Sequence, residues 1–296
     1  MTNHALGALG VWLSRNTPPD EIAELAQVAE RLGMGAFWLS GGSSRGIFDD
    51  IQGVLAATST IAVGTSIANM YFESPAEATA AYWRLEGEFP GRFFLGVGPS
   101  HAPLVGKSTL GPYERPLIKS RSYLDALDAQ ATPVPNHRRL LSALGPLALK
   151  LASQRTLGTI PYLMPVAHTA FAREVLGPDA LLAPELGVVL SDDPQLARRH
   201  AREFLSPYLA LPNYTDNFLR HGFDPVDLEG GGSERLLAGI FAFGSAAAIG
   251  DRIDEHLTAG ADHVAIQVLA VEGQSRADVL SAIALERGLG AQVNES

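Results

Sequence analysis

Two segments of the sequence combine reactive side chains with a spacing that could do chemistry. Residues 42–46 read Gly-Ser-Ser-Arg-Gly, the pattern of a nucleophile elbow in which Ser44 would attack an acyl carbon. The apolar segment before it and the helical segment after it match the strand and helix that this motif requires. However, the last histidine, His263, begins a predicted strand instead of following one, unlike the base of such hydrolases. Hydrolysis by Ser44 therefore stays an alternative to a simple glycine-rich loop.

The second candidate is His101, which lies just after an apolar segment, residues 92–98. A histidine can give or take a proton near neutral pH, so His101 is a candidate catalytic residue, and a solvated loop histidine is the other interpretation. The histidines show no HxH or HExxH spacing, and we expect no metal site. The chain has no cysteine, and no third glycine follows Gly96 and Gly98 to complete a dinucleotide fingerprint. Redox chemistry would therefore need a bound organic cofactor.

Eight short apolar segments bounded by Gly, Ser, Pro or Asn could position these side chains. We predict strands at 7–14, 36–41, 61–68, 92–98, 138–144, 158–164, 183–190 and 262–270. Amphipathic segments between them predict helices. Because the strand segments are apolar on both faces, they predict a parallel sheet covered by helices, and eight such units predict a closed (β/α)8 TIM barrel. A doubly wound open sheet is the alternative.

Two connections are much longer than the others, residues 99–137 and residues 191–261. In a barrel, loops that follow a strand lie at the carboxyl-terminal face, where active sites are built. We therefore expect residues 191–261 to form a helical insertion before the last strand that helps to enclose a pocket. No flexible linker brackets this segment, so we expect one domain over residues 1–296.

Composition and charge exclude several classes of partner. The chain carries 22 Lys and Arg against 32 Asp and Glu, a net charge of -10, and no Lys/Arg cluster is evident, so we expect no nucleic acid partner. The longest weakly polar stretch, residues 236–250, is shorter than the ~20 residues that span a bilayer. The amino terminus has no basic region ahead of an apolar stretch. We expect a cytoplasmic protein with no membrane partner.

Six segments spread along the chain share a distinctive pattern: GVWLS (10–14), AFWLSG (36–41), IAVGTSIANMYFESPAEATAAY (61–82), FPGRFFLGVGPSHAPLV (89–105), YERPLIKSRSYLDALD (113–128) and AGADHVAIQVL (259–269). Together they resemble the bacterial luciferase-like monooxygenase superfamily, and within it the actinobacterial oxidoreductases that use the deazaflavin coenzyme F420. The resemblance covers nearly the whole chain in the right order. It implies a (β/α)8 barrel with a long insertion before the last strand, and a homodimer. The implied activity is hydride transfer between F420 and a small organic substrate, with a reduced-FMN-dependent monooxygenase as the alternative.

The resemblance also assigns residues to the cofactor. Ser66 and Ile67 match a non-prolyl cis peptide that presses on the ring, and Asn69 matches a polar residue at the ring edge. The remaining matches concern turns. Gly98 and Ser100 match a turn beside the ring or tail, and Ala143, Leu144 and Gly145 match the backbone that meets the phosphate at a helix amino terminus.

Two positions depart from the relatives. Ser40 begins a Ser-Gly-Gly loop where relatives often carry Asp, Glu or His, and we count Ser40 among the cofactor contacts. His101 stands where some relatives carry a Glu near the reacting carbon, which favours a place in the pocket as proton donor or cofactor contact. Trp12, Tyr71, Tyr113 and Tyr162 could line the same pocket, although ordinary packing is the preferred interpretation for Trp12.

Overall fold

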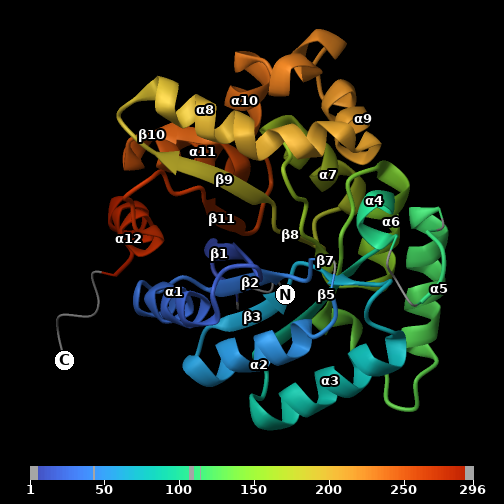
Figure 1. The fold of residues 1–296 in the computed structure, drawn as a ribbon. Helices are drawn as coiled ribbons and strands as arrows, with labels where there is room; N and C mark the ends of the chain where they lie inside the picture. Colours follow the sequence, from blue (N-terminus) through green and yellow to red (C-terminus); the bar gives the residue numbers. More distant parts are fainter. Residues whose placement is uncertain (1–5, 43, 107–109, 114, 291–296) are drawn as a thin grey trace.

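The computed structural model describes residues 6–42, 44–106, 110–113 and 115–290, and its strands form one parallel sheet that curls on itself (Figure 1). The strands are β1 (Leu9–Ser14), β2 (Ala36–Ser40), β3 (Ala62–Thr65), β4 (Ala68–Asn69), β5 (Phe93–Gly98), β6 (Arg139–Leu141), β7 (Gly158–Thr159), β8 (Leu181–Leu182), β9 (Glu185–Leu190), β10 (Ala242–Gly244) and β11 (Val264–Val268). Their order in the sheet is β10-β9-β11-β1-β2-β3-β5-β6-β7-β8, and β4 pairs with β5.

The sheet closes because β8 and β9 are two parts of one barrel strand. On one side, the backbone N–H of Ala183 donates to Thr159 O at 3.0 Å, next to β7. On the other side, the N–H of Ala265 in β11 donates to Pro184 O at 2.9 Å. Since β11 also pairs with β1, the ring of strands is complete. The predicted (β/α)8 barrel is confirmed, and the open doubly wound sheet is wrong.

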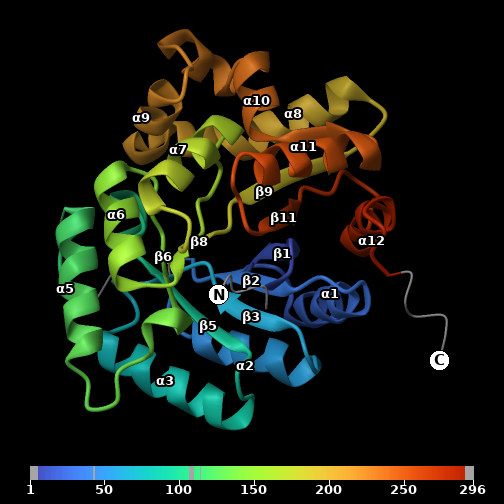
Figure 2. The same cartoon turned by 180° about the vertical axis from the view of Figure 1, so that it is seen from behind.

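A helix follows each barrel strand, and these helices form a closed outer ring. Each packs against the next in the order α1, α2, α3, α5, α6, α7, α11, α12 and back to α1. Figure 2 shows the same arrangement from behind. The helices are α1 (Pro19–Arg31), α2 (Ile47–Ala57), α3 (Pro75–Glu88), α4 (Ala102–Val105), α5 (Pro116–Asp128), α6 (Pro146–Arg155), α7 (Val166–Leu176), α8 (Pro194–Leu205), α9 (Pro212–Arg220), α10 (Glu234–Ile240), α11 (Ala246–Thr258) and α12 (Arg276–Glu286). None of these described helices is long and apolar enough to span a membrane.

Apolar packing holds the strands to the helices and fills the barrel itself. In α1, Ile22, Leu25 and Ala29 lie on one buried face, as their helical spacing predicts. Inside the barrel, the Trp38 indole N–H donates to Nε2 of His263 at 3.0 Å. Both side chains are fully buried near the amino-terminal end of β11, so they close the barrel floor.

The segment 191–261 is less uniform than the sequence predicted. It contains α8, α9 and α10 and the short 3-10 helices Ser206–Ala210 and Pro225–Gly231, which Figure 1 shows on one side of the molecule, away from α2 and α3. It also contains β10, which pairs with β9, and α11, which belongs to the outer ring. The insertion is helical as expected, but it is shorter than residues 191–261, because the chain rejoins the sheet at Ala242 before the barrel helix begins.

Three strand predictions also need correction. The segment 61–68 is split into β3 and β4, because the chain bulges at Ser66 and Ile67. The segment 138–144 is a strand only over Arg139–Leu141. The segment 158–164 is a strand only over Gly158–Thr159, since Pro161 has no N–H to donate to a neighbour and Leu163 adopts a left-handed conformation at φ 59°.

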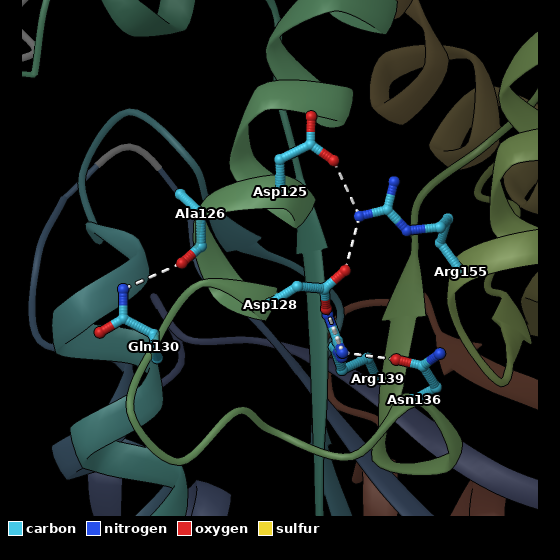
Figure 3. Close-up of polar contacts among 7 residues, drawn as sticks. All are labelled: Asp125, Ala126, Asp128, Gln130, Asn136, Arg139 and Arg155. Carbon is cyan, nitrogen blue, oxygen red and sulfur yellow. Dashed lines mark hydrogen bonds and ion pairs between the residues drawn. The ribbon is translucent and has the colours of Figure 1, made fainter.

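Ion pairs fix α5 against β6 and α6, as Figure 3 shows. The Arg139 side chain is only 2% exposed and donates from Nη2 to Asp128 Oδ1 at 2.6 Å and to Asn136 Oδ1. Arg155 on α6 donates to Asp128 Oδ2 at 2.7 Å and to Asp125 Oδ1 at 2.9 Å. Burial raises the pKa of Asp128, but hydrogen bonds from the two arginines outweigh it and lower that pKa overall. This network anchors the carboxyl-terminal end of α5, whose other end lies at the cavity described next.

Candidate active site

A cavity of about 470 Å³ opens at the carboxyl-terminal ends of the barrel strands; we call it the mouth cavity. This volume is within the range of small-molecule sites. Its lining comprises Trp12, Ser14, Asn16, Ser40, Gly41, Gly42, Ser66, Ile67, Pro99, Ser100, His101, Tyr113, Pro116, Leu117, Ser120, Ser142, Ala143, Leu144, Gly145, Ala148, Ile160, Tyr162, Phe204, Tyr208, Asn213, Tyr214 and Gln267. In the described part of this lining there is no Asp, Glu, Lys or Arg.

Most of the residues that the resemblance assigned to the cofactor meet in the mouth cavity. Those in its lining are Ser40, Ser66, Ile67, Ser100, His101, Ala143, Leu144 and Gly145. The peptide between Ser66 and Ile67 is cis, as expected. Two backbone hydrogen bonds hold this bulge against β2 and the loop after it. Ser66 N donates to Leu39 O at 2.8 Å, and Gly41 N donates to Ile67 O at 3.0 Å.

Asn69 and Gly98 are absent from this lining and lie behind it. The Asn69 side chain is 1% exposed; its Oδ1 accepts from Tyr71 N at 3.0 Å and its Nδ2 donates to Gly42 O at 3.3 Å. At Gly98, an added Cβ would lie 2.2 Å from Ser142 Oγ. The two residues therefore shape the cavity wall from behind, one by tying the 41–42 loop and the other by allowing close packing.

His101 is the amino-terminal cap residue of α4, and its ring faces the insertion. The ring centroid lies 5.1 Å from that of Tyr214 on α9. The side chain is half-buried, and this burial lowers its pKa below the usual value. At neutral pH the imidazole is therefore uncharged, which leaves one ring nitrogen able to accept a proton.

The wall opposite the strand ends is aromatic and carries hydroxyl groups. Tyr162 OH donates to Gln267 Oε1 at 3.0 Å and lies 3.3 Å from Tyr208 OH. The Tyr162 ring packs on Trp12 with centroids 4.8 Å apart, and Trp12 Nε1 donates to Ser66 Oγ at 3.0 Å. Tyr162 and Tyr113 thus line the cavity as expected. Trp12 packs in the barrel core, as preferred, and also borders the cavity. Tyr71 instead stacks behind Tyr113, at 5.5 Å.

The turn at residues 142–145 leads into α6 at the edge of the cavity. No side chain caps the amino terminus of α6, and an added Cβ on Gly145 would meet open space. Behind the turn, Nε2 of His168 lies 2.9 Å from Leu144 O and fixes this backbone. An uncapped helix amino terminus at a cavity is a suitable place for a phosphate group, so this end of the cavity fits the tail of a flavin or deazaflavin.

A model of the luciferase-like monooxygenase family matches residues 4–263. The chain belongs to this family. Its family membership makes it an oxidoreductase.

Solved structures of this family share the fold at low sequence identity. One is an F420-dependent secondary alcohol dehydrogenase in complex with an F420-acetone adduct, with 15% identity, coverage of 95% of this chain and 97% of that one, and a TM-score of 0.71. Another is the coenzyme F420-dependent tetrahydromethanopterin reductase from Methanopyrus kandleri, with 18% identity, 94% and 97% coverage, and a TM-score of 0.75. A third is the oxygenating constituent of 3,6-diketocamphane monooxygenase from Pseudomonas putida in complex with FMN, with 14% identity, 96% and 98% coverage, and a TM-score of 0.68.

The nucleophile elbow has no support in the luciferase-like barrel. Ser44 is exposed, lies outside the mouth cavity, and accepts a hydrogen bond from Arg15 only through its backbone carbonyl. Within the described residues, no histidine lies within hydrogen-bond distance of its hydroxyl. The described residues also contain no group of three side chains suited to a metal ion.

Sequence reasoning missed the part of the wall that comes from the insertion. Phe204, Tyr208, Asn213 and Tyr214 lie in the segment expected to enclose a pocket, but their types alone carry no signal of a site. Gln267 offered a clearer signal, because it is a polar residue inside the otherwise apolar strand VAIQV.

Proposed function

We propose that this luciferase-like enzyme transfers a hydride between coenzyme F420 and a small neutral organic substrate. The observation that carries the proposal is that Ser66 and Ile67, the uncapped start of α6, and the uncharged His101 all line one cavity. When bound, F420 would supply the carbon that accepts or gives the hydride. The protein residues bind it, exclude water and handle the proton.

In the proposed position, the cofactor ring lies at one end of the mouth cavity and its phosphate lies at the other. Ser66, Ile67 and Ser40 would contact the ring, and the backbone from Ala143 to Gly145 would meet the phosphate. These are proposals for individual contacts, and each can be tested by substitution.

His101 would accept the hydroxyl proton of an alcohol as its hydride leaves, and would return that proton in the reverse direction. A neutral imidazole suits this role as a general base. Because the described lining has no charged side chain, and the start of α6 is assigned to the cofactor phosphate, a charged group on the substrate would be desolvated without an ion-pair partner. A hydroxyl or carbonyl group could instead bond to Tyr208 or Gln267.

The second candidate is a monooxygenase that uses reduced FMN. The FMN-containing neighbour favours it, because it has the same fold with a similar TM-score. The first experiment is therefore a titration of the apo-protein with F420 and with FMN, followed by absorbance and fluorescence. We expect F420 to bind with a micromolar or lower Kd and FMN to bind more weakly. FMN binding as tight as F420 binding would make the deazaflavin assignment wrong.

A pair of variants tests the phosphate position. Gly145 has φ -83° and ψ 159°, which any residue can adopt, and open space for a side chain. Gly145→Asp would cap α6 and place a negative charge at the proposed phosphate site. Gly145→Asn is the matched control, because it caps the helix equally well without the charge. We expect the Asp variant to bind F420 at least 10-fold more weakly than the Asn variant, with both at least as stable as the wild type; equal Kd values would place the phosphate elsewhere.

We further propose that the enzyme is a homodimer, that its barrel and insertion form one domain, and that it acts in the cytoplasm. The resemblance to the family supports the dimer, and the composition supports the location. Light scattering on the purified protein measures the oligomeric state directly. A monomer at micromolar concentration would remove the dimer from the proposal.

A further inference from the structure

A carboxyl group lies buried inside the barrel beneath the mouth cavity without a cationic partner. Glu185, the first residue of β9, is 1% exposed. In the parallel pairing it lies opposite Ala265, which belongs to the apolar cluster inside the barrel, so its side chain also faces the interior. Among the described residues, no Lys, Arg or His forms an ion pair with it, and its Oε1 has no hydrogen-bond partner. A buried carboxyl that does not contribute an ion pair needs another explanation.

Glu185 holds the chain on both sides of Tyr162. Its Oε2 accepts from Leu163 N at 2.9 Å, and its own backbone N–H donates to Pro161 O at 2.8 Å. Leu163 has φ 59°, a left-handed conformation that a leucine rarely adopts. The carboxyl therefore bonds the backbone N–H of the residue that adopts this unusual conformation.

The residue held in this way is the centre of the aromatic wall. The Tyr162 hydroxyl contacts Gln267 and Tyr208, and its ring packs on Trp12. Trp12 in turn donates to Ser66 Oγ. A continuous series of contacts thus runs from Glu185 through Tyr162 and Trp12 to the bulge at Ser66.

We propose that Glu185 is a positioning residue that sets Tyr162 against Trp12 and thereby fixes both the hydroxyl wall and the bulge at Ser66. It does not line the cavity, so it acts through Tyr162 and not by contact with a ligand. A leucine of similar size would fill the space but would leave Leu163 N without an acceptor. The chain at 161–163 would then relax, and Tyr162 would leave Trp12.

The choice of variants follows from the protonation of this group. Burial raises the pKa of Glu185 to about 8, although the Leu163 N–H lowers it in part. Besides Tyr162, the titratable groups that influence it are Tyr208 and Tyr214, and both are uncharged near neutral pH because burial raises their pKa. The protonated acid predominates at pH 7, so Glu185→Gln is a close mimic that keeps an oxygen for Leu163. Glu185→Leu removes the acceptor of the Leu163 N–H. Glu185→Asp moves the acceptor away from Leu163, because the aspartate side chain is one methylene shorter.

The first test uses apo-protein, so it does not depend on the cofactor assignment. Near-ultraviolet circular dichroism reports the packing of Trp12 on Tyr162, with Trp12→Phe as the reference for its loss. We expect Glu185→Gln to keep the wild-type spectrum, and the Leu and Asp variants to approach the Trp12→Phe spectrum. A wild-type spectrum in both of them would overturn the proposal. If the Leu variant does not fold, the comparison of Asp with Gln decides the question.

The second test is a double-mutant cycle on F420 affinity, which rests on the proposed function. We expect Glu185→Leu to raise the F420 Kd about 10-fold in the wild type and less than 2-fold in a Tyr162→Leu background, because its effect passes through Tyr162. An equal loss in both backgrounds would indicate a general structural role and would overturn the proposal. If F420 does not bind the wild type, the proposed function fails, while the dichroism result still decides the role of Glu185.

Discussion

The barrel floor provides a quantitative prediction on acid unfolding. His263 Nε2 accepts from the Trp38 indole, and its Nδ1 lies 2.9 Å from Gly7 O and 3.1 Å from Leu6 O. The proton therefore sits on Nδ1, and a second proton on Nε2 would point at the Trp38 N–H. Burial, which outweighs the two carbonyl contacts, lowers the pKa of His263 to about 4 from 6.5.

This pKa fixes both the sign and the size of the effect. The unfolded chain binds the proton below pH 6.5, whereas the folded chain resists it until about pH 4. Stability from His263 is therefore present above pH 6.5 and is lost as the pH falls to 4. At about 1.4 kcal/mol for each pH unit, the loss amounts to roughly 3 kcal/mol.

The assay is urea unfolding of the wild type and of His263→Gln between pH 7 and pH 4. Glutamine does not titrate, and it satisfies the Trp38 N–H and the two backbone carbonyls less well than histidine does. We therefore expect the variant to be about 1–2 kcal/mol less stable at pH 7. The order should reverse by pH 4, because only the wild type loses the roughly 3 kcal/mol. His137→Gln, at an exposed position, is the control for the substitution itself. A constant difference between wild type and His263→Gln at all pH values would refute this reasoning.

The other predictions concern the cavity and its supports. In steady-state assays with any substrate that is turned over, His101→Gln should lower kcat by roughly 10²–10⁴-fold. The F420 Kd, measured by fluorescence titration, should change only a few-fold. If kcat and F420 affinity fall equally, His101 is a cofactor contact. Gly98→Ala should lower the free energy of unfolding by about 1–3 kcal/mol, because its Cβ would lie 2.2 Å from Ser142 Oγ. Adding Ser142→Ala should restore part of that loss, and no recovery in urea unfolding would contradict the contact. Asp128→Asn should cost about 2 kcal/mol, since it removes the carboxylate beside the buried Arg139 guanidinium; an unchanged urea midpoint would show that the ion pair adds nothing.

The sequence predicted the barrel well because each strand can be recognised from its own residues. A segment such as residues 36–41 is apolar on both faces and bounded by glycine, which is what a buried parallel strand requires. The early end of β7 was only partly predictable: Pro161 is visible in the sequence, but the conformation of Leu163 involves a hydrogen bond to Glu185, 22 residues further along the chain. Asn69 was assigned to the ring edge by resemblance, but its hydrogen bonds to the backbone depend on the approach of the 41–42 loop.

For a similar reason, the sequence could not predict which residues of the insertion line the cavity. Tyr208 and Tyr214 point at the cavity only because α8, α9 and the intervening 3-10 helix pack over β9 and Tyr162. That arrangement is set by tertiary packing and not by any local pattern. By contrast, Ser66 and Ile67 were found from their family match alone, since the GTSI segment is specific.

The way the insertion leaves and re-enters the sheet has a consequence for how new specificities arise. Its two ends are tied together where Ser191 N donates to Gly244 O at 3.1 Å, next to the β9–β10 pairing. The helices between them, from α8 to α10, can be exchanged for another segment without changing the distance that the chain must bridge. Because the proposed cofactor contacts lie earlier in the chain, between Ser40 and Gly145, such an exchange would alter what is recognised and leave the redox machinery in place. Recombination at this one junction is therefore a short evolutionary route from one substrate to another.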